Sequence, residues 1–297
     1  MAECELACDA GCDLGESPIW DERTGRLYFV DINGKRVHVY EPASGAHRSF
    51  QLDQPVGTIA LTSDPNKLLA ALERDIVEVD ATTGATGRVL ATSPEEHGVE
   101  GYRHNDGKAT PQGSLLVGRM HSKWRDGNPG RLYALHPCSS ELVQVLDGVG
   151  LPNGMAWDEG KQAVFFVDSA AETITAFAAD DKGTPKVETA RVVSHVPTQH
   201  KHVPDGMTID SFGNLWVALG ESGAVVCYSG GTGQELRRVS LPVKRPTACT
   251  FGGDQLQHLY VTTRVETGES ASPNHGGLFR VAIPGVHGAA PAYKFQL

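Results

Sequence analysis

No stretch of this chain is apolar and long enough to cross a bilayer, and no stripe of basic residues runs along it. The formal net charge of −10 argues against nucleic acid or an anionic membrane surface as a partner. The first ten residues, MAECELACDA, lack the basic and then apolar segments of a secretory signal. We therefore expect a cytoplasmic protein with no nucleic-acid, membrane or obligatory protein partner.

Cysteine is scarce and scattered, with six residues in 297. A chain of this length does not need disulfides as staples. Cys4, Cys8 and Cys12 repeat every four residues, which is not the C-x₂-C spacing of zinc knuckles, and no paired second half follows. They fit an N-terminal strand and loop better than a metal or redox site. The sequence leaves their role open.

A convincing helical apolar stripe is also missing. Period-2 alternation, β-branched residues and turn signals recur instead about every ten residues, and 34 glycines supply turns. Larger units recur at roughly 40 to 50 residues, a spacing typical of propeller blades. We predict an all-β fold: a single six-bladed β-propeller with four-stranded antiparallel blades, covering 1–297 as one domain. A pair of β-sandwiches does not explain the repeat, and the segment Glu3 to Asp13 is free to add a strand to the last blade.

Four polar side chains share one repeat position, just at the start of the first strand of a blade: Glu16 in ESPIWD, Asn105 in NDGKAT, Asn153 in NGMAWD and Asp205 in DGMTID. The remaining blades have Val56 and Thr247 there. Asn or Asp before Gly is common in turns, so one such pair means little. Four matched positions predict oxygen ligands around one mouth of a central channel, where a hard divalent cation could bind.

The chain resembles the senescence marker protein/gluconolactonase/regucalcin family over essentially its whole length. The resemblance is carried, in order, by GESPIW, RHNDGK, GLPNGMAW, FVDS, VPDGMTID, GNLWVA, RPTACTFGG and LYVTT. It implies a six-bladed propeller that binds one divalent metal and hydrolyses sugar lactones. By motif, it implies Glu16, Asn153 and Asp205 as metal ligands, Arg103 and Asn105 as substrate contacts, and Asp205 as the catalytic base.

The oxygen ligands suit Ca²⁺, Mg²⁺ or Mn²⁺, and Zn²⁺ is an alternative although no histidine or cysteine ligand is evident. Some family members carry an acidic MAEE segment after the strand that corresponds to SLLVGRM. This chain has His121, Ser122 and Lys123 there. We therefore expect a more basic pocket wall, with Lys123 as a substrate contact beside Arg103, and a preference for electron-rich or anionic substrates.

Other polar residues have simpler interpretations. His195, His200 and His202 lie in a polar segment before Asp205, most simply a solvated loop. Asp31 and Asp168 both end FVD strands, so we expect backbone hydrogen bonds or support near the channel mouth rather than metal ligation. No G-x-S-x-G context is present, which argues against a serine nucleophile.

Three functions compete. The first is metal-dependent hydrolysis of a sugar lactone by an activated water. The second is a calcium-binding regulatory protein without turnover, which would have to use the channel because no EF-hand loop is present. The third is another hydrolase or a lyase on a related propeller, as in the paraoxonase-like and strictosidine-synthase-like groups. The RHNDGK and VPDGM segments favour the first.

Overall fold

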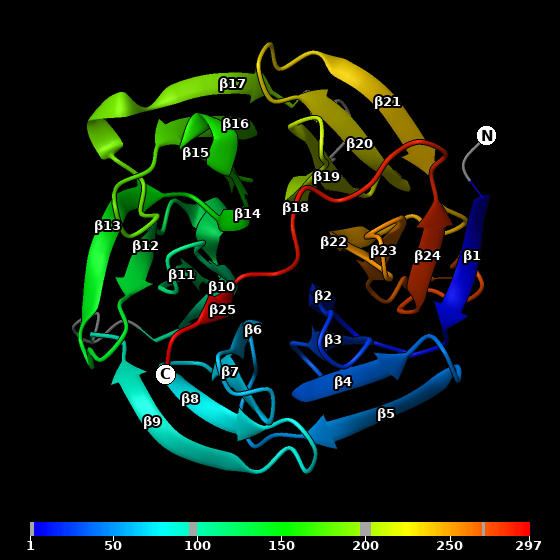
Figure 1. Cartoon of the computed structure of the whole chain (residues 1–297), viewed down its shortest axis with the longest axis horizontal. Helices are drawn as coiled ribbons and strands as arrows, with labels where there is room; N and C mark the ends of the chain where they lie inside the picture. The colour runs from blue at the N-terminus through cyan, green and yellow to red at the C-terminus, as the bar shows by residue number, and fades with distance from the viewer. Residues whose placement is uncertain (1–2, 95–99, 197–202, 269–270) are drawn as a thin grey trace.

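The computed structural model describes residues 3–94, 100–196, 203–268 and 271–297. Six sheets of the described chain stand around a central channel (Figure 1). Within each four-stranded antiparallel blade, the strands run outward from the channel in chain order. In the last blade, the outermost strand comes from the N-terminal segment. In the first blade, the innermost strand is buried along its whole length, whereas the outermost is mostly exposed. The predicted six-bladed propeller is confirmed, and the β-sandwich alternative is wrong.

The strands of the first three blades, from the innermost outward, are β2 (Gly15–Asp21), β3 (Arg26–Asp31), β4 (Arg36–Glu41) and β5 (Ala46–Gln51); β6 (Thr58–Thr62), β7 (Lys67–Ala71), β8 (Asp75–Asp80) and β9 (Thr86–Thr92); and β10 (Tyr102–Ala109), β11 (Leu115–His121), β12 (Gly130–Leu135) and β13 (Leu142–Val149).

Those of the next three are β14 (Pro152–Asp158), β15 (Ala163–Asp168), β16 (Thr173–Ala178) and β17 (Arg191–His195); β18 (Val203–Ile209), β19 (Asn214–Gly220), β20 (Ala224–Ser229) and β21 (Glu235–Ser240); and β22 (Pro246–Gly252), β23 (His258–Thr263), β24 (Leu278–Ala282) and β1 (Glu3–Cys8). The helices of the described residues are the short 3₁₀ turns η1 (Trp124–Asp126), η2 (Glu159–Lys161) and η3 (Val187–Thr189). None of them has the length or apolar character needed to cross a bilayer.

The apolar core is divided among the interfaces between neighbouring blades. Ile19 and Tyr28 of the first blade pack with Ile59 and Leu68 of the second, and equivalent clusters fill the other five interfaces. A blade therefore buries its two faces only when both neighbours are present, which makes closure of the ring part of the core energetics.

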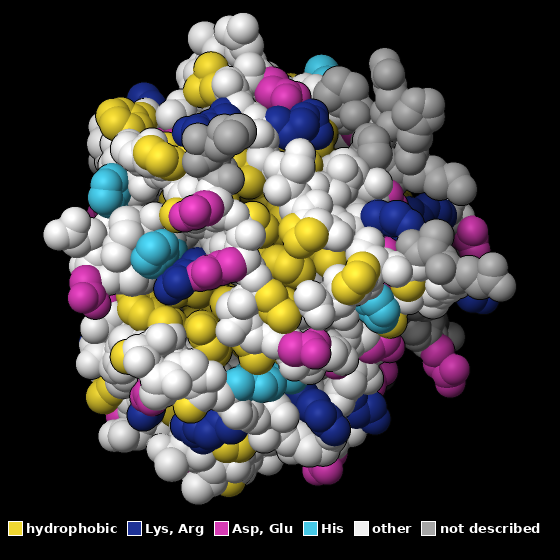
Figure 2. Space-filling view, turned by 90° about the vertical axis from the view of Figure 1, so that its right-hand side faces the viewer, with side chains coloured by type: hydrophobic (Ala, Val, Ile, Leu, Met, Phe, Trp, Pro, Cys, Tyr) yellow, Lys and Arg dark blue, Asp and Glu magenta, His cyan; other side chains and the backbone are white. Residues whose placement is uncertain are grey.

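The N-terminal strand closes the ring as expected. β1 pairs antiparallel with β24, so the last blade combines strands from both ends of the chain. Arg280 of β24 forms an ion pair with Glu5 of β1. Figure 2 shows the side of the ring at the right of Figure 1, where charged side chains of both signs surround hydrophobic ones.

The C-terminal tail adds a feature that the sequence did not predict. It runs across the middle of the ring (Figure 1) and ends in β25 (Lys294–Phe295), which pairs parallel with β6 as a fifth strand of the second blade. The Ala289 amide donates to the carbonyl of Ile209, the last residue of β18, and the Gln296 amide donates to the carbonyl of Gly113, which follows β10. The tail thus covers the channel end where innermost strands finish, opposite the end where they begin.

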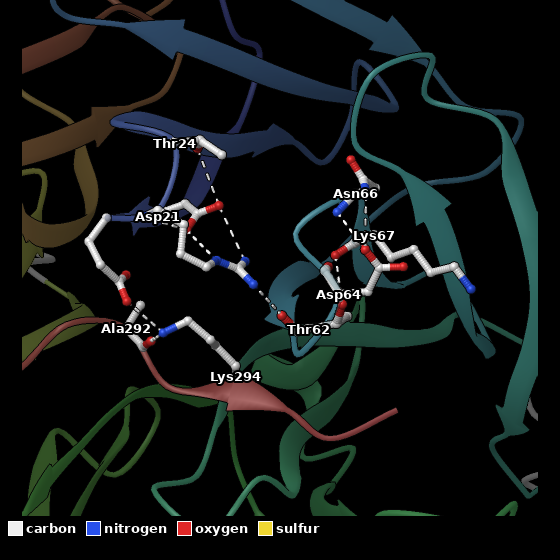
Figure 3. A network of polar contacts seen from close by, with 10 residues as sticks. Asp21, Thr24, Thr62, Asp64, Asn66, Lys67, Ala292 and Lys294 are labelled. Atoms are coloured by element: carbon white, nitrogen blue, oxygen red, sulfur yellow. Dashed lines mark hydrogen bonds and ion pairs between the residues drawn. The ribbon is translucent and has the colours of Figure 1, made fainter.

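Side chains at this end join the first two blades to the tail (Figure 3). Asp21 accepts a hydrogen bond from the Arg23 Nε, and the Arg23 Nη1 donates to the Thr62 carbonyl of the second blade at 2.8 Å. Lys294 of the tail donates to Glu22 at 2.6 Å. This end is therefore a closed, structural face.

Candidate functional site

The candidate ligands lie where the innermost strands lose their regular pairing. The ladder shifts register between Glu16 and Ile19 in β2, and between Pro204 and Met207 in β18. Equivalent shifts occur in β10 and β14, next to Asn105 and Asn153. A β-bulge releases residues from the ladder and redirects their side chains. The repeat thus places four irregular segments at the same end of the channel.

These segments open into a cavity of about 360 Å³. Its wall contains five of the predicted site residues: Glu16, Arg103, Asn105, Asn153 and Asp205. Thr247, at the same repeat position in the last blade, also lines it. The four oxygen-bearing side chains therefore share one channel mouth, as the repeat predicts.

Hydrogen bonds fix the amides of the cavity in one orientation. The Arg103 Nη1 donates to the Asn105 Oδ1 at 2.8 Å, and the Asn105 Nδ2 donates to the Asn153 Oδ1 at 2.9 Å. The Asn153 Nδ2 in turn donates to the Ser169 Oγ at 2.7 Å. Because Ser169 holds the nitrogen of Asn153, the amide oxygen faces the cavity and keeps a lone pair for another partner. Ser169, which the sequence did not predict, positions Asn153.

Burial and neighbouring carboxylates raise the pKa values of Glu16 and Asp205. Burial, followed by the nearby Asp205 and Asp106, raises the pKa of Glu16 well above its usual value. Burial and the charge of Asp106 raise the pKa of Asp205 to about 8. Desolvated carboxylates this close repel one another, and a divalent cation between them would remove that cost. The donor set of Glu16, Asp205 and the Asn153 oxygen therefore fits a hard divalent cation.

Arginines balance this negative charge. Arg103 and Arg264 each lower the pKa of Asp205, against the effects of burial and of Asp106. Arg245 pairs with Glu221 at 2.7 Å, and both line the cavity. Arg264 also lines it, and its Nε is buried with no hydrogen-bond partner in the described structure. Arg245 begins the RPTACTFGG motif, which gave it no role, and no motif marked Arg264 or Glu221. All three residues flank strand ends on the cavity wall.

The segment after β11 is arranged differently from our expectation. Lys123 is exposed and does not lie in the cavity wall, which takes the next two residues, Trp124 and Arg125. The Arg125 guanidinium carbon lies 4.0 Å from the centroid of the Trp124 ring. His121 is buried against Tyr102, and its Nε2 lies 2.8 Å from the Glu100 carbonyl oxygen. The basic side chain that this segment adds to the wall is thus Arg125.

The backbone hydrogen bonds expected of Asp31 and Asp168 are confirmed. Asp31 accepts hydrogen bonds from the amides of Asp13 and Leu14, and Asp168 accepts from Gly150 and Leu151, all at 3.0 Å. Both therefore anchor the segment that leads into an innermost strand. His195 is an exposed residue at the end of β17, whereas His200 and His202 lie outside the described residues.

A family model, two relatives and a solved structure are similar to this chain over most of its length. A family model described as "SMP-30/Gluconolactonase/LRE-like region" matches residues 14–265. Regucalcin of Xenopus laevis is 32% identical, covering 94% of this chain and 93% of its own length. A pentonolactonase of Haloferax volcanii is 34% identical, covering 93% and 92%. The crystal structure of a calcium-binding regucalcin from Agrobacterium tumefaciens superimposes with a TM-score of 0.88 at 26% identity, covering 98% and 97%.

Proposed function

The chain belongs to the SMP-30/gluconolactonase/LRE-like family, and from that premise we propose that it hydrolyses sugar lactones with one divalent cation bound by Glu16, Asn153 and Asp205. The observation that carries the proposal is the convergence of two desolvated carboxylates and an oriented amide oxygen in one cavity. The pentonolactonase relative supports lactone chemistry, and the calcium-binding relative supports a divalent cation.

A bound divalent cation supplies Lewis-acid polarisation of the lactone carbonyl and lowers the pKa of water. Asp205 is the proposed base, which takes a proton from the attacking water. The acyl–oxygen bond of the ring then breaks, and the proton passes to the departing ring oxygen. Glu16 is the rival base, because it is the other carboxylate among the proposed ligands. The VPDGM segment favours Asp205.

Arg103 and Asn105 are proposed to hold the substrate. The hydrogen bonds of Arg103 to Asn105 and to the His104 carbonyl both use Nη1, so its other N–H groups can bind sugar oxygens. The Asn105 amide nitrogen donates to Asn153 and to the Pro152 carbonyl. Asn105 therefore connects the substrate side of the cavity to the metal side.

The test is acid release from a panel of sugar lactones by metal-stripped and metal-reloaded protein. We expect turnover only after reloading with Ca²⁺, Mg²⁺, Mn²⁺ or Zn²⁺, and the same panel identifies the preferred ion. Glu16→Ala should lose both the metal of the channel site and turnover, because two anions supply most of the attraction for a hard cation.

Binding of the cation without hydrolysis of any lactone would overturn the enzymatic proposal and favour the calcium-binding alternative. Wild-type metal affinity in Glu16→Ala would instead overturn the ligand assignment. Asp168→Asn is a matched control, because Asp168 binds backbone amides and does not line the cavity. This variant should keep its metal even if it is less stable.

A further inference from the structure

A second group of metal-binding side chains lies away from the cavity. The ligand atoms of Cys12, Asp31 and His38 lie within 4.8 Å of one another among the described residues. All three side chains are buried, with 2%, 5% and 2% of their surface exposed. None of them lines the 360 Å³ cavity. The group lies where the N-terminal segment passes from the last blade to the first.

The same position in another blade shows what the fold itself requires. Asp31 and Asp168 stand at the same repeat position and make the same pair of backbone hydrogen bonds. The residue equivalent to His38 in the fourth blade is Thr175 by strand register. The residue equivalent to Cys12 is Val149, which directly precedes Gly150 as Cys12 directly precedes Asp13. The aspartate is thus explained by the turn that it anchors. The turn does not explain the Cys12 thiol and the His38 imidazole, because the fourth blade has the same turn without them.

The imidazole of His38 is held with one nitrogen toward the sulfur. Its Nδ1 lies 2.9 Å from the Nε2 of exposed His47, and its ring stacks on Phe29 with centroids 4.7 Å apart. The other nitrogen, Nε2, lies 3.7 Å from the Cys12 Sγ. A ligating histidine commonly uses its second nitrogen in a hydrogen bond of this kind, which fixes the ring and its tautomer.

The spacing fits a shared metal ion. With Zn–S near 2.3 Å and Zn–N near 2.0 Å, a sulfur and a nitrogen in one tetrahedral shell lie ~3.5 Å apart, close to the 3.7 Å observed. A thiolate and a carboxylate also neutralise a dication. We propose that Cys12, His38 and Asp31 bind Zn²⁺ at a second metal site, distinct in chemistry from the all-oxygen site in the channel.

The position of Cys12 gives this site a structural role. The Cys12 amide donates at 2.9 Å to the Gly276 carbonyl, just before β24 of the last blade, while its side chain faces His38 on β4 of the first. Metal binding at the side chain would therefore fasten the last blade to the first. The site reinforces the closure of the ring at the one interface built from the two ends of the propeller.

Cobalt(II) gives a direct test, because a thiolate–cobalt bond produces charge-transfer absorption in the near ultraviolet and oxygen ligands do not. We expect this absorption in the wild-type protein, from one cobalt ion per chain, whether or not a second cobalt ion binds in the channel. It should vanish in Cys12→Ser, weaken in His38→Gln and persist in Cys138→Ser, which alters the exposed cysteine. Zn²⁺ should displace the cobalt and raise the melting temperature of wild type but not of Cys12→Ser.

The wild-type spectrum is decisive even if Cys12→Ser fails to fold. Cobalt saturation without thiolate charge transfer, or absorption that survives in a folded Cys12→Ser, would overturn the proposal. Glu16→Ala separates the two sites, since it removes a channel ligand and should keep the thiolate absorption. If the channel assignment fails, the cobalt test of the Cys12 site is unaffected. If the Cys12 site fails, the test of the channel site is equally unaffected.

Discussion

At the scale of single residues, Asp205 combines two proposed roles, as a metal ligand and as a base. Asp205→Asn keeps an oxygen for the cation but removes the basic carboxylate. We expect the variant to retain metal and to lose kcat by about 10²-fold or more, measured on metal-saturated protein. Near-normal kcat under metal saturation would exclude Asp205 and leave Glu16 or free hydroxide as the base.

The charge of the cavity wall gives a second prediction at this scale. Arg125 lines the cavity, whereas neighbouring Lys123 does not. Arg125→Glu should raise KM for acidic lactones on the order of tenfold relative to neutral ones, because it reverses a charge facing the substrate. Lys123→Glu is the matched control and should leave the ranking of substrates unchanged. Steady-state kinetics of both variants with acidic and neutral lactones provides the measurement. An altered substrate ranking in Lys123→Glu, with an unchanged one in Arg125→Glu, would show that Lys123 and not Arg125 faces the substrate.

The sequence predicted the part of the site that follows the repeat. Glu16, Asn105, Asn153 and Asp205 could be aligned because each starts an innermost strand, and a symmetric ring carries equivalent positions to the same place. Arg125, Arg264 and Glu221 come from loops that differ from blade to blade. Their positions depend on tertiary packing, so no periodic signal could identify them.

At the scale of elements, β25 illustrates the same limit. It has two residues and pairs parallel to β6, so it has neither the length nor the hairpin turn that marks a strand in sequence. β1 was predictable because the ring needed a final strand and the N-terminal segment was unassigned. The requirement that the ring close predicted β1 and gave no information about β25.

The C-terminal element should contribute stability without contributing to catalysis. Phe295 of β25 is 1% exposed and packs in the core between the second and third blades. Phe295→Ala should therefore lower the free energy of unfolding by about 3–5 kcal/mol. The KM of the Phe295→Ala variant should equal that of wild type, because the tail covers the channel end opposite the cavity. Leu297→Ala, at a residue 37% exposed, is the control and should cost much less in denaturant unfolding.

At the scale of the whole molecule, the ring concentrates carboxylates on its axis. The raised pKa values of Glu16 and Asp205 mean that the folded, metal-free protein binds more protons than the unfolded chain above pH 4. Their contribution to stability is therefore lost as pH rises from about 4, where unfolded carboxyls ionise, to about 8, where Asp205 ionises in the folded state.

We accordingly expect the melting temperature of metal-free protein to fall between pH 5 and pH 8, and bound metal to restore more stability at pH 8 than at pH 5. The double variant Glu16→Gln, Asp205→Asn should show a much flatter dependence. Calorimetry across this range provides the measurement. A metal-free wild-type profile as flat as that of the double variant would contradict the pKa assignments.

Closure of the ring by β1 also has a consequence for biosynthesis. β1 leaves the ribosome long before its partner strand is made, since Glu5 and Arg280 are 275 positions apart. At ~5–20 residues per second, this interval lasts roughly 14 to 55 seconds. During that time β1 is an unpaired strand able to join a wrong edge. Glu3 and Glu5 place negative charge on it, so the nascent chain carries its own protection against mispairing until the last blade arrives.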